Sequence, residues 1–258
     1  MLTVDFPLLV LGLSFGTLAL SVKLGDFIRK RSGTSQEKPR DDLGIVLAGT
    51  LTLLGLIIGF SFSMATSRYE LRKSCEQIEA NAIATEWIRS DLLQAVDAVK
   101  LRELLKMYLD KRLLFYTVRN RQQLRSISFE TSQLQNDLWS AIRSRFASAP
   151  PPVQGILISG LNDVMNSEAS TQAAFDNRVP LLAWLLIVVI ASGCSFLIGL
   201  RAHRTDWLVF LVIPIAVSIS LFLIADLDSP REGAIRNGPK NLIRLTDAID
   251  TASITHRK

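Results

Sequence analysis

Residue types that commonly carry catalysis or bind metals are scarce in this sequence and lie far apart. The only histidines are His203 and His256, and neither forms a recognisable nucleophile or zinc motif with a carboxylate or a cysteine. Cys75 lies in a charged stretch and Cys194 in an apolar one, so we expect neither a disulfide between them nor a shared metal ion. The sequence therefore indicates a protein that is not an enzyme and has no cofactor.

Two carboxylates that could bind a cation follow the last apolar run of the chain. Asp226 and Asp228 are two residues apart, and together with backbone carbonyl oxygens they could hold a cation. The same Asp-Leu-Asp-Ser-Pro sequence is also typical of a turn that ends a helix at a membrane boundary. Because two carboxylates are few for a calcium site, the turn is the favoured interpretation.

A second group of polar residues lies in a charged stretch with helical spacing. Glu79 and Glu86 are seven residues apart and share a helical face, while Glu86 and Arg89 have the three-residue spacing of an ion pair. A solvated face or a contact between helices is the usual role of such charges. The alternative is that Glu79, Asn81 and Arg89 form buried polar contacts between neighbouring subunits.

The elements that carry these residues follow from the separation of apolar and charged residues. Hydrophobic residues make up 48% of the chain and charged residues 21%, yet four stretches contain almost no charge. Each stretch is near the roughly 17–25 apolar residues that cross a bilayer as a helix. The net charge of +5 arises beside these stretches, where anionic lipid headgroups rather than nucleic acid are the expected partner. The predicted spans are residues 6–22, 43–65, 179–200 and 207–225.

Between the second and third spans, apolar residues recur at intervals of three and four, the pattern of amphipathic helices. One such stripe consists of Leu71, Cys75, Ile78 and Ala82, and a second of Leu101, Leu104, Leu105, Tyr108 and Leu109. We therefore predict an all-α, multi-pass membrane protein in which two pairs of spans flank a helical, water-exposed domain. Its parts are a first span pair (1–65) with a basic linker (23–42), the helical domain (66–178), a second span pair (179–225) and a polar C-terminal tail (226–258). Basic residues in the short loops favour the outside for the large domain, but basic residues near the opposite ends of the spans reduce the margin, so its side is undecided.

The second span has the most informative pattern. Gly55 and Gly59 form a GxxxG pair, a spacing that lets another helix approach closely, so we expect helix packing there. Gly59-Phe60, followed after seven residues by Arg68-Tyr69, resembles the pore-lining helix of bestrophins. The order of two spans, a helical polar domain, two spans and an acidic segment is also similar to that family. The segment Glu79-Ala80-Asn81-Ala82-Ile83 and the Leu-Asp-x-Pro element at 227–230 are more similar still to a bacterial bestrophin-like group, which implies a bacterial inner membrane.

The resemblance implies a homo-oligomeric ion channel, pentameric and selective for anions, in which this helix lines the pore. The narrow neck of that family falls on Thr52, Leu56 and Phe60 of this chain. Thr52 is polar where the family's neck is apolar, and the two aspartates are fewer than the acidic cluster that binds calcium in animal bestrophins. Calcium gating is therefore not implied. Bestrophins keep the large domain in the cytosol, whereas the loop charges here favour the outside.

The leading hypothesis is an oligomeric ion channel with lipids and ions as partners. Hydroxyl groups along the second span offer hydrogen bonds to a passing ion, and apolar rings at Leu56 and Phe60 could gate by dewetting. The alternative is a non-conducting membrane scaffold or sensor whose helical domain binds a partner.

Overall fold

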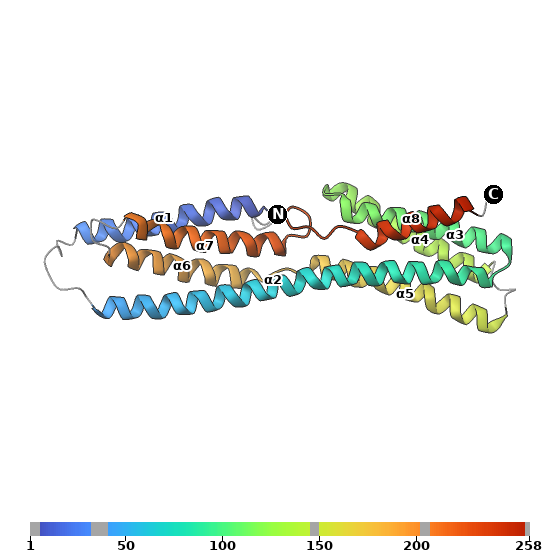
Figure 1. Ribbon diagram of the computed structural model, residues 1–258, viewed down its shortest axis with the longest axis horizontal. Coiled ribbons are helices and arrows are strands. Elements are labelled where there is room, and N and C mark those ends of the chain that lie inside the picture. Colours follow the sequence, from blue (N-terminus) through green and yellow to red (C-terminus); the bar gives the residue numbers. More distant parts are fainter. Residues whose placement is uncertain (1–5, 32–40, 145–149, 202–206, 256–258) are drawn as a thin grey trace. The chain divides into compact units, whose positions relative to one another are not determined.

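The computed structural model describes residues 6–31, 41–144, 150–201 and 207–255 (Figure 1). All regular structure in these ranges is helical, which confirms the predicted all-α class. Four helices are long and apolar enough to cross a membrane, and their apolar parts match the four predicted spans. The histidines His203 and His256 and residues 32–40 of the basic linker lie outside the described residues. The elements are α1 (Pro7–Arg31), α2 (Asp41–Arg89), η2 (Ser90–Leu92), α3 (Ala95–Thr117), α4 (Arg121–Ser144), α5 (Pro151–Asp176), α6 (Leu181–Arg201), α7 (Trp207–Asp228) and α8 (Lys240–Thr255).

The first of two compact units contains the membrane spans and comprises residues 1–69 and 178–236. In it α1 packs against α6 and α7, which Figure 1 shows side by side. Buried apolar residues of α1, α2, α6 and α7 form one cluster, with Leu54, Ile187 and Leu221 among its most buried members. These side chains fix the face that α2 turns toward the other spans.

The helix α1 is longer than its predicted span of residues 6–22, because the first nine residues of the expected linker continue it to Arg31. Two interactions support this extension. Asp26 pairs with Arg29 and Lys30, three and four residues ahead on the same helical face, each at 2.5 Å. Gly25 packs directly against the backbone of α6.

The second unit comprises residues 70–177 and 237–258 and is the helical polar domain together with α8. The predicted stripe on α3, from Leu101 to Leu109, is buried at its core. The stripe predicted on α2 is wrong in part, because Leu71 and Ile78 are 48% and 55% exposed while Cys75 is buried. The α2 face that packs inward combines apolar residues such as Ile83 with four buried polar residues, Arg72, Glu76, Glu79 and Glu86.

Within the predicted tail 226–258, the last sixteen described residues form α8, which belongs to this second unit. Leu242 and Ile249 of α8 are buried in the domain core. The carboxylate of Glu76 on α2 accepts hydrogen bonds from the backbone N–H groups of Asn241 (2.7 Å) and Leu242 (2.9 Å). A carboxylate at a helix N-terminus satisfies otherwise unpaired N–H groups and interacts favourably with the helix dipole, which anchors α8.

Candidate functional site

The three predicted neck residues lie on a face of α2 that the described part of the chain leaves uncovered. Leu56 is 54% exposed and Phe60 is 64% exposed, and Thr52 is also exposed. Their four-residue spacing places them along one side of the helix. The opposite side carries Leu54, Ser61 and Ala65, which are buried. One side of this helix is therefore fixed within the chain, and the other is free to meet a pore, another subunit or lipid.

The GxxxG glycines lie beside the neck residues on the same uncovered side. A methyl group added at Gly55 or Gly59 would meet nothing within 4 Å among the described residues. Within the described part of the chain, no helix makes use of their small size. Close approach within the chain occurs between α1 and α6 instead. A methyl group at Gly25 would lie 2.2 Å from the carbonyl oxygen of Phe196, and one at Gly199 would lie 2.1 Å from that of Val22.

Hydroxyl groups on α2 are already paired with the helix backbone. Thr52 donates its hydroxyl proton to the carbonyl oxygen of Ala48 (2.9 Å), and Thr66 donates to that of Phe62 (3.0 Å). In this arrangement the hydroxyl oxygen presents lone pairs to its surroundings, whereas rotation about χ1 would present the proton. These groups can therefore solvate an ion of either sign.

The two aspartates in the last turn of α7 are buried and bind backbone N–H groups. The two carboxylate oxygens of Asp226 accept hydrogen bonds from Ala234 (2.6 Å) and Ile235 (2.8 Å). Asp228 accepts one from the N–H of Val179 (3.0 Å), just before α6. Among the residues that the structure describes, no group of three or more His, Cys, Asp or Glu is placed to hold a metal ion. This geometry favours the turn over a cation site.

Glu79 is the centre of a buried polar network inside the helical domain. Its carboxylate forms an ion pair with Arg112 and accepts hydrogen bonds from the hydroxyls of Tyr116 and Thr171, both at 3.0 Å. Arg112 also lies 3.4 Å from Glu168. Burial alone would lower the pKa of Arg112, but the adjacent carboxylates raise it above its usual value. The network joins α2, α3 and α5 and keeps the guanidinium charged.

Sequence analysis missed the partners of Glu79, because they follow it by 33, 37 and 92 residues and no short spacing relates them. Of the other residues predicted with it, Asn81 is exposed. Glu86 is fully buried, and its carboxylate lies 3.7 Å from Arg89. Arg89 also donates to the carbonyl oxygen of Ile156 on α5 (3.3 Å). Glu79, Glu86 and Arg89 thus make contacts within the domain of one chain.

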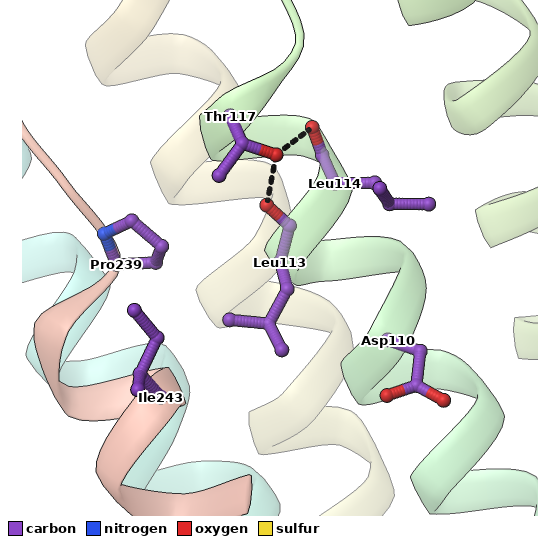
Figure 2. A pocket seen from close by; sticks show the side chains of 6 residues that line it. All are labelled: Asp110, Leu113, Leu114, Thr117, Pro239 and Ile243. Atoms are coloured by element: carbon purple, nitrogen blue, oxygen red, sulfur yellow. Dashed lines mark hydrogen bonds between the residues drawn. The ribbon is translucent and has the colours of Figure 1, made fainter.

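An open groove in the same domain lies between the end of α3 and the start of α8 (Figure 2). Its lining is mostly apolar, and the Thr117 hydroxyl donates to the carbonyl oxygens of Leu113 and Leu114. Asp110 supplies the one carboxylate of the lining. Because one carboxylate without a base or nucleophile beside it cannot form a catalytic constellation, this groove does not indicate an enzyme. The lining residues are Asp110, Leu113, Leu114, Thr117, Pro239 and Ile243.

The fold and the uncovered α2 face define a class of multi-pass helical membrane protein in which one long helix joins the spans to a helical domain. The sequence of residues 16–242 matches the model of the Bestrophin-like domain. The chain therefore belongs to the bestrophin-like family. A search of curated proteins found no match.

Solved structures with a similar fold are crystal structures of a bacterial bestrophin homologue from Klebsiella pneumoniae. One, phased with zinc, is 14% identical and has a TM-score of 0.63, with 93% of this chain and 98% of that chain covered. Two point variants are 16% and 13% identical, with TM-scores of 0.62 and 0.64. The alignments include 90% and 91% of this chain, respectively, and 98% of the chain of each variant. At these identities the likeness establishes the fold.

Proposed function

We propose that this chain assembles into a symmetric oligomer in the membrane and conducts ions through a central pore lined by α2. The observation that carries the proposal is the uncovered face of α2 with Thr52, Leu56 and Phe60, opposite a buried face that fixes the helix in its own chain. In a ring of subunits, equal faces of α2 surround the symmetry axis. Membership of the bestrophin-like family supports the same arrangement.

The residue types on this face fit a pore with a hydrophobic constriction. Leu56 and Phe60 are one helical turn apart, about 6 Å along the axis at 1.5 Å per residue. Repeated around an axis, they form two successive apolar rings that a hydrated ion must pass, and such rings gate by excluding water. The hydroxyl of Thr52 one turn away offers a hydrogen bond outside the constriction.

Packing between subunits in this proposal uses the glycines beside the neck. Gly55 and Gly59 leave open space next to the α2 backbone, so a neighbouring helix can approach closely there. Five subunits and a preference for anions are proposed from the resemblance to bestrophins. Apolar rings by themselves do not select the sign of the ion, so selectivity arises elsewhere along the pathway.

A non-conducting scaffold or sensor is the second candidate, and exposed apolar residues of the helical domain favour it. Leu71 and Ile78 on α2 are about half exposed and lie outside the domain core. A partner protein could cover them and bury their apolar surface.

The experiment that tests conduction combines assembly and transport in one preparation. The mass and symmetry of the detergent-solubilised protein are measured, and the same protein is reconstituted into liposomes for chloride flux. We expect a cyclic oligomer and a flux that scales with the amount of protein. A monomer without flux would refute the channel, because a pore on a symmetry axis requires subunits around it.

A further inference from the structure

The helical domain contains a second buried carboxylate whose surroundings differ from those of Glu79. Glu86 is fully buried, yet neither of its carboxylate oxygens has a hydrogen-bond donor within the described part of the chain. Buried carboxylates normally have such donors, because an ionised group loses much hydration energy in the interior. Glu79, by contrast, has three side-chain partners. Glu86 therefore does not take part in a structural ion pair of the usual kind.

The contact between α2 and α5 is built closely around this carboxylate. Gly160 of α5 faces it, and a methyl group at that position would lie 1.8 Å from Oε2 of Glu86 and 2.3 Å from Nη1 of Arg89. The two helices therefore meet where Glu86 lies. Any change in the size or hydration of the Glu86 carboxyl group acts directly on this contact.

The charges around Glu86 oppose one another. Arg89 on α2 is the nearest positive group, but its Nη1 is 3.7 Å from Oε2 and donates instead to the carbonyl oxygen of Ile156. On the α5 side, Asp163 adds a negative charge. Burial raises the pKa of Glu86 from 4.5 to about 7, and the stabilising effect of Arg89 does not cancel this rise. Its carboxyl group is then mostly protonated at pH 6 and mostly ionised at pH 8.

We propose that Glu86 is a proton-binding site that switches the contact between α2 and α5. When protonated, the neutral carboxyl group packs against Gly160 and the contact is closed. When ionised, the carboxylate draws water toward the interior and the contact loosens. A group whose folded-state pKa lies above its unfolded value stabilises the fold fully at low pH, and this contribution is lost as the pH rises through the folded value. The loss here falls between about pH 4.5 and 7.

The test measures amide hydrogen exchange of the full chain in detergent at pH 6 and pH 8, expressed as protection factors so that the chemical effect of pH is removed. We expect the amides of residues 83–89 on α2 and 156–163 on α5 to lose protection by about ten-fold between these values. Glu86→Gln keeps the shape of the side chain but cannot ionise, so it should abolish this loss. Glu103→Gln, at a surface residue that pairs with Lys100, is the matched control and should behave as the wild-type protein.

Two results would overturn the proposal. The first is equal protection of the wild-type amides at both pH values. The second is an undiminished loss in Glu86→Gln. If Glu86→Gln fails to fold, infrared spectra of the wild-type protein decide instead. A protonated-carboxyl stretch at pH 6 that disappears by pH 8 supports the switch, and its absence at pH 6 contradicts it.

Discussion

Gly199 lies on α6 where that helix meets α1, and it offers the sharpest test of how the membrane unit packs. A methyl group at Gly199 would lie 2.1 Å from the carbonyl oxygen of Val22 and 2.9 Å from the backbone nitrogen of Asp26. Both atoms belong to the backbone of α1, so no side-chain rotation can make room. The variant Gly199→Ala must therefore push the two helices apart by more than 1 Å, since carbon and oxygen atoms normally approach to about 3.2–3.5 Å.

Overpacking of this kind costs typically about 1–3 kcal/mol. With roughly 2–4 °C lost per kcal/mol in a chain of this size, we expect the midpoint of thermal unfolding in detergent to fall by about 2–12 °C. The matched control is Gly193→Ala on the same helix, where a methyl group meets nothing within 4 Å. Since alanine favours helix over glycine, the control should be unchanged or slightly stabilised. Equal midpoints for the two variants would refute the close approach of α1 and α6.

Three further predictions concern other parts of the structure. Glu79→Gln leaves the buried Arg112 without its main carboxylate partner, so the free energy of unfolding should fall by about 3–5 kcal/mol, measured by thermal unfolding. A fall as small as that of the surface variant Glu103→Gln would contradict the buried network. Gly59→Leu should weaken the oligomer, seen as a lower mass in detergent, because a bulky side chain prevents close helix approach; an unchanged assembly would mean that this face meets lipid or the pore. Because both carboxylate oxygens of Asp226 bind backbone N–H groups, calcium or EDTA should leave the unfolding midpoint unchanged, and a calcium-dependent rise would contradict this.

The sequence was sufficient to predict the spans because their signal is local. An uncharged run such as residues 43–65 is stable in the bilayer, and its length is that of a helix that crosses it. The stripe on α3 was predictable for the same reason, since Leu105 and Leu109 recur at the helical period. The GxxxG motif at Gly55 and Gly59 was also visible. Whether anything packs against it could not be predicted, and a methyl group at either glycine meets nothing within 4 Å among the described residues.

Features that depend on distant residues could not be predicted. On α2 the side that packs inward carries Glu76, Glu79 and Glu86. The prediction that the apolar residues of this part of the helix face the core was therefore wrong in part. Glu76 and Glu79 are buried because their partners come from distant parts of the chain. Glu76 binds the start of α8, and Glu79 binds Arg112 on α3. Residues 76 and 242 are far apart in sequence, and no periodicity relates them.

The length of α2 has a simple local cause that sequence analysis did not use. Between Phe60 and Arg89 the chain contains neither glycine nor proline, so nothing interrupts the helix where the apolar span ends and the charged part begins. The helix consequently runs through 49 residues from Asp41 to Arg89. The same helix thus carries the proposed neck and the buried carboxylates of the helical domain.

The pore assignment of α2 is tested most directly by chloride flux through liposomes that contain the Phe60→Ala variant. Phe60 is 64% exposed on the proposed pore face, and Phe62 is 44% exposed on a different face of the same helix, so Phe62→Ala is a control with the same change in size. We predict that Phe60→Ala raises flux while the oligomer stays intact, and that Phe62→Ala leaves flux at the wild-type level. Leu56→Ala should act in the same direction as Phe60→Ala. Unchanged flux in both Phe60→Ala and Leu56→Ala, with a clear fall in their unfolding midpoints, would contradict the pore assignment and favour the scaffold.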